Sequence, residues 1–357
     1  MPSCASCSIF VVVLAILAMG LFNVVSDGKS RMYWPPPQWS IEDIPSLEGQ
    51  TALVTGANVG LGYASSLELL KKGCVVIVAT RSPAKNVDTA KKLQAEASLP
   101  EKYRSNVVAP KVGLELNSLA SVEKFADSIL EDHKSLNILL NNAGIMMTPY
   151  GLTKDGYEQQ FGVNHVGHYA LTLRLMPLLE AGAPSRVVAV TSLGHRFASS
   201  DALDFDKLND EASYSPTAAY GRSKLANILF ARALARRVND KQIYVNAAHP
   251  GFVATELARH VKDSMFQFLS KDNIEYFMQT LTNMVAMTPT EGATTQLYLC
   301  MPEIAKRNIT GEYYVPTARK HDSHPLALSG PMSDMAKDDV LAEKLWAWTA
   351  KETGLDL

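Results

Sequence analysis

The pair Tyr220 and Lys224 is the first feature of this sequence that could do chemistry. The two residues are four positions apart in AAYGRSKLANILF, at the start of an apolar, helix-like run. On a helix, this spacing places both side chains on one face. A tyrosine can exchange a proton with a substrate oxygen, and a nearby ammonium would lower its usual pKa of about 10. Such pairs are also common on solvated helix faces, so other residues must decide between these interpretations.

Ser192 is a second candidate for the same chemistry. It follows the buried-strand pattern RVVAVTS at residues 186–192, where its hydroxyl could hold a substrate oxygen while Tyr220 moves the proton. Thr191 is the neighbouring alternative. The histidines at 165, 168, 195 and 249 are too scattered to indicate a metal site, and we interpret each as packed or hydrogen-bonded. We therefore expect no metal.

A glycine-rich turn predicts a second part of the site. TGANVGLG at residues 55–62 follows a strand pattern and opens a helix pattern. Its glycines allow a tight turn and a close approach of the backbone to a pyrophosphate, which the helix N-terminus attracts. The spacing is GxxxGxG rather than the common GxGxxG, and similar turns also occur without a ligand.

The end of the next predicted strand indicates which dinucleotide would bind. An NAD site usually has an acidic residue here that holds the ribose 2′-hydroxyl. This chain has Ala79 and Thr80, followed by Arg81. An arginine suits a 2′-phosphate, so we predict NADP(H), with a solvated arginine as the alternative.

The elements that would position these residues alternate along the chain. Short β-branched runs and longer amphipathic segments predict an α/β fold, a single Rossmann-type doubly wound parallel sheet with helices on both faces. The predicted strands are 51–55, 74–80, 106–116, 137–144, 186–192, 243–251 and 311–316. The predicted helices are 60–72, 85–97, 118–132, 156–181, 217–238, 289–302 and 337–353, and residues 257–288 could form a substrate lid or an ordinary packing helix.

Four motifs together resemble the short-chain dehydrogenase/reductase family. They are TGANVGLG, NNAG at 141–144, VNHVGHYALT at 163–172 and YGRSK at 220–224. The resemblance covers roughly residues 48–355, and NNAGIMMTPYGLTKDGYEQQFGVNHVGHYALT is especially similar to the retinol-dehydrogenase-like branch, which includes the WW-domain oxidoreductases.

The resemblance implies a role for each matching residue. Ser192, Tyr220, Lys224 and Asn164 would be catalytic, with Asn164 supporting a water-linked proton path unless it is only a satisfied core amide. Lys224 and Tyr220 would also contact the cofactor. The remaining cofactor residues would be Gly56, Asn58, Gly60, Leu61, Gly62, Arg81, Glu115, Leu116, Asn142, Ala143, Gly144, Pro250, Gly251, Val253 and Thr255. Two positions depart from the family pattern. Glu115 replaces an aspartate, and Val59 replaces a frequent basic residue, so the NADP(H) prediction depends on Arg81.

The N-terminus has a different character. Residues 8–25 form an apolar run without Lys or Arg before it, and Lys29 and Arg31 follow. We predict a membrane anchor at 1–28, a Pro-rich spacer at 29–47 and the catalytic domain at 48–357. A cleaved signal peptide is the alternative. The charges favour the endoplasmic reticulum with a cytosolic catalytic domain, and a secretory lumen or a plastid are alternatives.

Composition narrows the function classes. A formal net charge of −2 over 357 residues argues against a nucleic-acid partner. With the anchor, the motifs predict an NADP(H)-dependent oxidoreductase that interconverts a lipophilic alcohol (a retinoid, a steroid or a long-chain compound) with its aldehyde or ketone, with a homodimer as one option for its assembly. The alternatives are a protochlorophyllide-reductase-like plastid enzyme and a nucleotide-sensing scaffold without catalysis.

Overall fold

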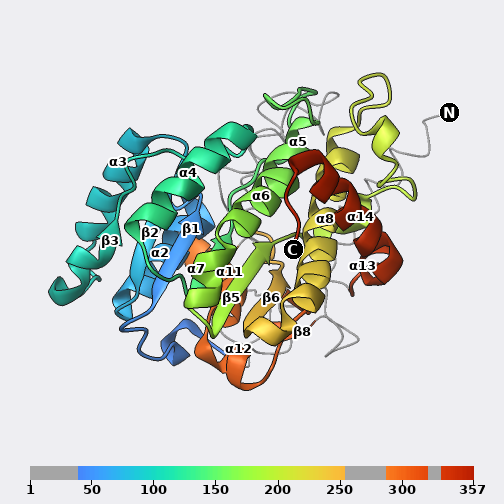
Figure 1. Cartoon of the computed structure of the whole chain (residues 1–357). Helices are drawn as coiled ribbons and strands as arrows, with labels where there is room; N and C mark the ends of the chain where they lie inside the picture. Colours follow the sequence, from blue (N-terminus) through green and yellow to red (C-terminus); the bar gives the residue numbers. More distant parts are fainter. Residues whose placement is uncertain (1–38, 254–286, 321–330) are drawn as a thin grey trace, which may run out of the picture.

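A single eight-stranded sheet forms the centre of the molecule, with strand order β3-β2-β1-β4-β5-β6-β7-β8 (Figure 1). The computed structural model describes residues 39–253, 287–320 and 331–357. Neighbouring strands from β3 to β7 run parallel, and β8 pairs antiparallel with β7. The strands are β1 (Thr51–Thr55), β2 (Val75–Ala79), β3 (Val107–Val108), β4 (Ile138–Asn141), β5 (Ser185–Val190), β6 (Ile243–Ala248), β7 (Tyr313–Val315) and β8 (Arg319–Lys320). The predicted parallel α/β sheet is confirmed, and only β8 was not expected.

The strand order reverses next to β1, and this reversal fixes where a ligand can bind. Leu53 of β1 pairs with Ile77 of β2 on one side and with Leu139 of β4 on the other. The chain connections therefore leave β1 and β4 in opposite directions across the sheet. In open α/β sheets, the crevice at the carboxyl ends of such strands is the usual ligand site.

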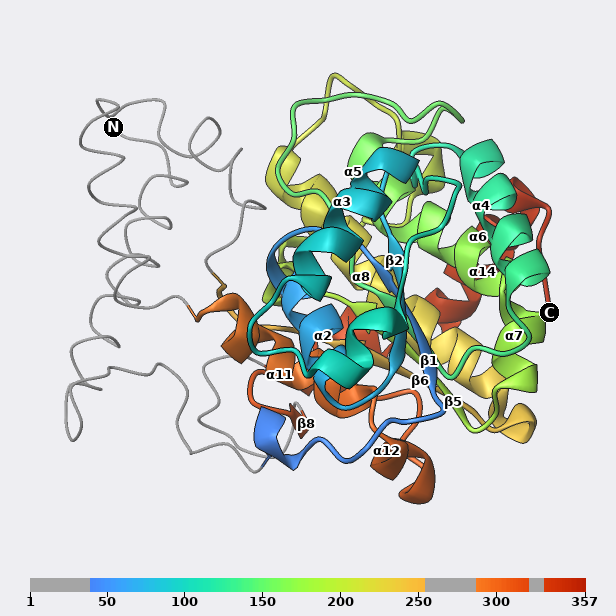
Figure 2. The same cartoon turned by 90° about the vertical axis from the view of Figure 1, so that its left-hand side faces the viewer.

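Helices cover both faces of the sheet and form two hydrophobic cores. Figure 2 shows α2 and α11 on one side and α4, α6 and α14 on the other. The first core includes buried residues of α2, α3, α11 and α12, and the second includes those of α4, α6, α8 and α14. The bounds are α2 (Gly60–Lys71), α3 (Pro83–Gln94), α11 (Pro289–Leu299), α12 (Pro302–Lys306), α4 (Leu119–Asp132), α6 (Gly167–Arg174), α8 (Pro216–Arg237) and α14 (Asp339–Thr353).

The predicted helix at 156–181 is wrong as one continuous element. The structure divides it into α5 (Gln159–Phe161), a π-helical turn η3 (Gly162–Val166), α6 and α7 (Met176–Ala181). Pro177 explains the later break, because proline has no N–H for an internal helical hydrogen bond. The π turn has no comparable mark in the sequence. The remaining short helices are η1 (Ile41–Asp43), η2 (Glu101–Asn106), η4 (Leu193–Phe197), η5 (Phe205–Lys207), η6 (Asn239–Lys241) and α13 (Asp334–Lys337).

The predicted strand at 106–116 is also wrong over most of its length, because only Val107 and Val108 pair with β2. Pro110 cannot donate a ladder hydrogen bond. Further along, Gly113 lies against the backbone of the preceding connection, where an added Cβ would be 2.6 Å from Arg81 O. This stretch therefore crosses the end of β2 as a close-packed loop.

The N-terminal predictions are only partly within the described residues. Residues 8–25 lie outside them, as do most of 257–288. Among the residues that the structure describes, no helix has the length and hydropathy needed to cross a membrane. Ile44 and Leu47, which the sequence assigned to the spacer, are buried in the core beside α2 and α11. The last residues of the predicted spacer therefore pack on the domain.

Candidate active site

The turn between β1 and α2 forms a cradle of bare backbone. Gly56 and Gly60 have φ angles of 67° and 55°, in the left-handed region that favours glycine. A Cβ at Gly62 would lie 2.3 Å from Gly56 O, so the two backbone segments touch without room for a side chain. Val59, the residue that begins α2, has no side-chain oxygen to cap the first N–H groups. These groups are directed at the turn, as a phosphate site requires.

Thr55 joins this cradle to the end of β4. Its Oγ1 accepts hydrogen bonds from the backbone N–H groups of Asn142 and Ala143, both at 2.9 Å. The Asn142 side chain also donates to Thr55 O at 2.8 Å. The structure thus brings Asn142, Ala143 and Gly144 beside the glycine turn, as the resemblance implied.

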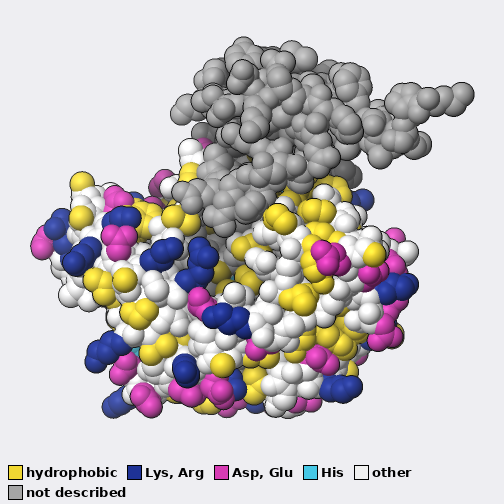
Figure 3. Space-filling model, turned by 90° about the horizontal axis from the view of Figure 1, so that it is seen from above, with side chains coloured by type: hydrophobic (Ala, Val, Ile, Leu, Met, Phe, Trp, Pro, Cys, Tyr) yellow, Lys and Arg dark blue, Asp and Glu magenta, His cyan; other side chains and the backbone are white. Residues whose placement is uncertain are grey.

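The end of β2 carries Arg81, which is exposed. Buried Asn86 holds the backbone before it, because its Oδ1 accepts hydrogen bonds from Thr80 N at 2.9 Å and Thr80 Oγ1 at 2.8 Å. The guanidinium of Arg81 forms no ion pair with another described residue, which leaves it available to an anion. Figure 3, which views the molecule from above, shows several Lys and Arg side chains on that face.

Glu115 and Leu116 lie on the loop that passes this strand end. Leu114 N donates to Thr80 O at 2.8 Å, which attaches the loop to the end of β2. The Glu115 carboxylate pairs with Lys154 at 2.5 Å, and Leu116 is buried against Gly167. The Glu115 side chain is therefore already engaged by a cation, and its backbone N–H donates to Ser121 Oγ at 3.0 Å.

Asn164 lies in the π turn and is fully buried. Its Oδ1 accepts from Ile145 N at 2.9 Å, and its Nδ2 donates to Ile145 O and to Ser223 Oγ, both at 2.9 Å. The side chain is thus a satisfied amide, and at the same time it ties the segment after Gly144 to helix α8. A π turn at a functional site is a recurrent arrangement.

Tyr220 and Lys224 are both buried on α8, at 4% and 3% exposure. The Lys224 ammonium lies 5.7 Å from the centre of the Tyr220 ring and donates to Val190 O at 3.1 Å. Val190 ends β5 directly before Thr191 and Ser192. The hydroxyl of Thr191, the neighbouring alternative, already donates its proton to Lys224 O at 2.7 Å.

The electrostatics of the pair differ from the sequence prediction. Burial raises the pKa of Tyr220 to about 12, and hydrogen bonding with Ser192 lowers it only in part. Burial also lowers the pKa of Lys224 to about 8. In the protein alone, burial of the phenol therefore raises the tyrosine pKa instead of lowering it. The lowered pKa expected from the sequence depended on the positively charged nicotinamide ring as well as on the ammonium. A cationic ligand ring beside the pair would be needed to favour the phenolate.

Gly194, which sequence reasoning missed, and His195, which it interpreted only as packed or hydrogen-bonded, support Ser192 and Tyr220. Gly194 packs on the tyrosine ring, where an added Cβ would be 2.8 Å from Tyr220 Cε1. Its N–H donates to Ser192 Oγ at 3.0 Å. His195 Nδ1 lies 2.8 Å from Ser192 O, and Ser333 N donates to His195 Nε2 at 3.1 Å. The glycine two residues after the strand-end serine was the available signal in the sequence.

The segment after β6 completes the far side of the site. Gly251 has a φ of 95°, and its N–H donates to His249 Nδ1 at 3.2 Å. Val253 pairs with Met287 and lies close to Leu61, because a Cβ at Gly292 would touch both side chains. Pro250 is buried, and Thr255 lies outside the described residues.

The four histidines of the sequence prediction are buried and hydrogen-bonded, as expected. In the described parts of the chain, no group of three or more His, Cys, Asp or Glu residues could hold a metal ion.

The residues present fit a nicotinamide dinucleotide. Lys224 has three donors and, among the described residues, one acceptor, Val190 O. A Cβ at Gly144 would lie 3.2 Å from Asn164 Oδ1 and 3.5 Å from Lys224 Nζ, so this glycine keeps the approach to the ammonium open. The bare turn adjoins this segment, because a Cβ at Gly56 would lie 3.1 Å from Ala143 Cα.

Comparison with known proteins agrees with this geometry. Residues 56–316 match the family model described as enoyl-(acyl carrier protein) reductase. The chain is 38% identical over 310 residues to retinol dehydrogenase 14 of Mus musculus, with 84% of each chain covered. A crystal structure of an uncharacterized protein from Mycobacterium paratuberculosis is similar with a TM-score of 0.64 and 31% identity, covering 89% of this chain and 98% of the other.

A second solved structure contains a cofactor. The active-site complex of Pseudomonas aeruginosa RhlG with NADP is similar with a TM-score of 0.56 and 25% identity, covering 76% of this chain and 95% of the other. This chain therefore belongs to the short-chain dehydrogenase/reductase family and is an oxidoreductase whose curated relatives include retinol dehydrogenases.

Proposed function

With family membership as the premise, we propose that this chain is an NADP(H)-dependent enzyme that interconverts a lipophilic alcohol with its aldehyde or ketone. The observation that carries the proposal is the buried set of Tyr220, Lys224 and strand-end Ser192, adjoining a bare glycine turn. When bound, the nicotinamide would supply or accept the hydride.

The chain's own residues would handle the proton and the orientation. The Ser192 hydroxyl would hold the substrate oxygen, and the Tyr220 hydroxyl would give its proton to that oxygen during reduction or take it during oxidation. Lys224 would hold the nicotinamide ribose with the donors that Val190 O does not use. Gly56, Gly60 and Gly62 would admit the pyrophosphate.

The choice of NADP(H) is supported by Arg81, which is exposed at the end of β2 where no acidic residue stands. The lipophilic substrate class is supported by the retinol dehydrogenase relatives and by two exposed aromatic side chains beside the site. Phe197 is 55% exposed at the end of η4, and Phe252 is 41% exposed after Gly251. The predicted anchor at 1–28 would keep the enzyme at a membrane that dissolves such substrates.

A substrate panel with both cofactors tests the proposal. Apolar alcohols and aldehydes, including a retinoid, a steroid and a long-chain aldehyde, are assayed with NADP(H) and NAD(H). We expect turnover with NADP(H) preferred. No turnover on the whole panel despite tight NADPH binding would contradict the enzyme and favour the nucleotide-sensing alternative.

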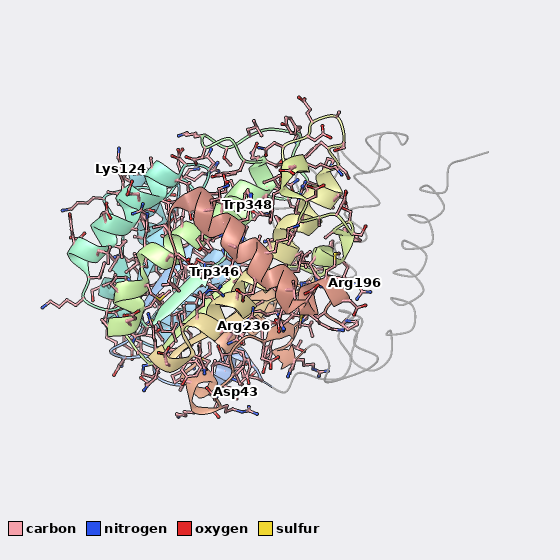
Figure 4. The ribbon with its side chains drawn as sticks, turned by 45° about the vertical axis from the view of Figure 1, so that its right-hand side comes forward. Asp43, Lys124, Arg196, Arg236, Trp346 and Trp348 are labelled. Carbon is pink, nitrogen blue, oxygen red and sulfur yellow. The ribbon has the colours of Figure 1, made fainter. Side chains whose placement is uncertain are left out.

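A charge reversal tests the cofactor assignment separately. Arg81→Asp should move the NADPH-to-NADH ratio of kcat/KM toward NADH by about 10-fold to 100-fold, because hydrogen bonds to a charged phosphate are lost. Lys124→Asp is the matched control, since Lys124 projects into solvent from α4 (Figure 4). An unchanged ratio in Arg81→Asp would reject the role of Arg81.

A further inference from the structure

His168 lies between the cofactor turn and the catalytic helix. It is 3% exposed, on the first turn of α6. Its Nε2 lies 3.0 Å from Thr55 Oγ1, and its Nδ1 lies 3.0 Å from Asn164 O. One ring therefore contacts the strand that leads into the glycine turn and the π turn that carries Asn164.

Counting protons fixes the direction of both contacts. Thr55 Oγ1 accepts from Asn142 N and Ala143 N, which uses both of its lone pairs. Its single proton then goes to His168 Nε2 at 3.0 Å, since the competing Leu140 O is at 3.4 Å. A carbonyl can only accept, so His168 Nδ1 carries the hydrogen that is donated to Asn164 O.

The charge state agrees with this count. Burial is the largest cause that lowers the pKa of His168 to about 4; the nearby Lys224 cation also lowers it, and the hydrogen bond to Asn164 O raises it only in part. The ring is therefore neutral at physiological pH, with one donor and one acceptor, both in use. A protonated ring would have two donors and would leave only the more distant Leu140 O, at 3.4 Å, to accept the Thr55 proton.

We propose that His168 is a positioning residue that holds the Thr55–Asn142–Ala143 junction and Asn164 in one fixed geometry, which rests on the proposed function of the site. The Thr55 arm sets where the cofactor-side backbone lies. The Asn164 arm sets the π turn, whose asparagine reaches Ile145 and Ser223 next to Lys224. The ring thus couples the place where cofactor binds to the place where the proton moves.

Two amide substitutions separate the two arms. An asparagine amide lies near the position of Nδ1, so His168→Asn keeps the donor to Asn164 O and loses the acceptor for Thr55. A glutamine amide extends to the position of Nε2, so His168→Gln keeps the acceptor for Thr55 and loses the donor to Asn164. His168→Phe removes both bonds and keeps a planar ring. His133→Asn, at the end of α4, is the matched control.

The readouts are the NADPH Kd from fluorescence titration without substrate, kcat at saturating NADPH, and Tm. We expect His168→Asn to raise the Kd by about 10-fold with kcat nearly kept, and His168→Gln to lower kcat by about 10-fold with the Kd nearly kept. His168→Phe should show both changes, and His133→Asn neither.

The outcomes that overturn the inference differ from those that reject the function. If all three His168 variants lower Tm while the Kd and kcat of the folded protein stay at the wild-type values, His168 only fills the core and the inference fails. Equal changes of the Kd and kcat in the Asn and Gln variants would also overturn it. If the wild type turns over no substrate, the proposed function fails, and the Kd of the Asn and Phe variants still tests the Thr55 arm.

Discussion

The two ends of helix α8 carry polar networks of opposite character. Near its start, Tyr220, Lys224 and Asn227 are buried, and Val190 O accepts from both Lys224 at 3.1 Å and Asn227 at 3.0 Å. Near its end, arginines pair with carboxylates of α14 at the surface. Those contacts are Arg232–Asp339 at 2.8 Å, Arg236–Asp339 and Arg236–Glu343 at 2.7 Å, and Arg237–Glu343 at 2.5 Å.

Solvent explains the difference between the two networks. The Lys224 cation is buried beside a carbonyl and has no carboxylate partner among its described contacts, which costs free energy that folding alone does not recover. The arginines at the end of α8 lie at the surface in contact with water, where each exposed ion pair contributes little to stability. Figure 4 labels Arg236 of this second network and Trp346 of α14; the Arg237 guanidinium lies 4.1 Å from the centre of the Trp346 ring. The helix therefore carries a costly buried cation at the proposed site, while its exposed cations contact the neighbouring helix α14.

The largest expected effect removes the hydroxyl from the buried end. Tyr220→Phe should lower kcat by about 10²-fold to 10⁴-fold, because the proton donor is lost while the ring still packs on Gly194. NADPH binding should stay at the wild-type level. Steady-state kinetics and fluorescence titration measure both, with Tyr150→Phe as the control. Turnover close to wild type would rule out the proton role.

Lys224→Met tests whether the buried ammonium lowers the stability of the protein while it supports turnover. It should lower kcat/KM by about 100-fold and yet stabilise the cofactor-free protein by about 1 kcal/mol, because a buried charge is replaced by an apolar chain of similar length. Denaturant unfolding without cofactor measures this, and a clear loss of stability would contradict it.

The pH dependence of the same protein gives an independent check. Burial lowers the pKa of Lys224 from 10.5 to about 8. Between these values the unfolded chain binds more protons than the native protein, so this group makes the wild type more stable as pH rises through that window. Below pH 8 both states are protonated and the full cost is present. The difference between wild type and Lys224→Met should therefore shrink from pH 8 upward, which unfolding curves at several pH values can show.

A smaller effect is expected at the turn that supports the pair. Gly194→Ala places a Cβ 2.8 Å from Tyr220 Cε1, so the ring must move. We expect kcat to fall by about 10-fold while the NADPH Kd stays constant. Gly156→Ala is the control, because its φ of 86° strains the backbone but no atom lies within 4 Å of the added carbon. The control should lose stability and keep kcat. The opposite pattern would reject the packing argument.

The smallest effect belongs to the surface end. Hydrogen bonds from Arg237 and Arg236 lower the pKa of Glu343 to about 2. Glu343→Gln should destabilise the protein by about 1 kcal/mol or less. Because the native pKa is depressed, this contribution is present above about pH 4.5 and is lost as the pH falls toward 2. Urea unfolding at low and high salt measures it against Glu131→Gln on α4, and kcat should not change. A loss of unfolding free energy as large as that expected for replacing a buried residue would contradict the comparison between the two ends of α8.

The local signals in the sequence led to most of the site. Each of these signals lies within a short stretch of sequence: the glycine turn, the strand ends and the spacing of Tyr220 and Lys224. The sheet then brings these stretches to one edge. The His168–Thr55 contact joins residues 113 positions apart, so no local pattern shows it. The direction of the Tyr220 pKa also depended on burial, which the residue types do not reveal. Pro110 and Pro177 were local signs of the short β3 and of the helix break. The strand and helix periodicities nevertheless predicted elements that continue through both prolines.

The π turn at Gly162–Val166 limits how the chain length can vary. A π turn accommodates one residue more than an α turn, and each residue of an α-helix rotates the following side chains by about 100°. With the extra residue, Asn164 reaches Ile145 and Ser223, while His165 meets Thr349 of α14 at 3.0 Å. Deleting any one residue of this turn would rotate either Asn164 or His165 away from its partners. Relatives that keep both contacts must therefore keep the same number of residues between Glu158 and His168, whatever their side chains.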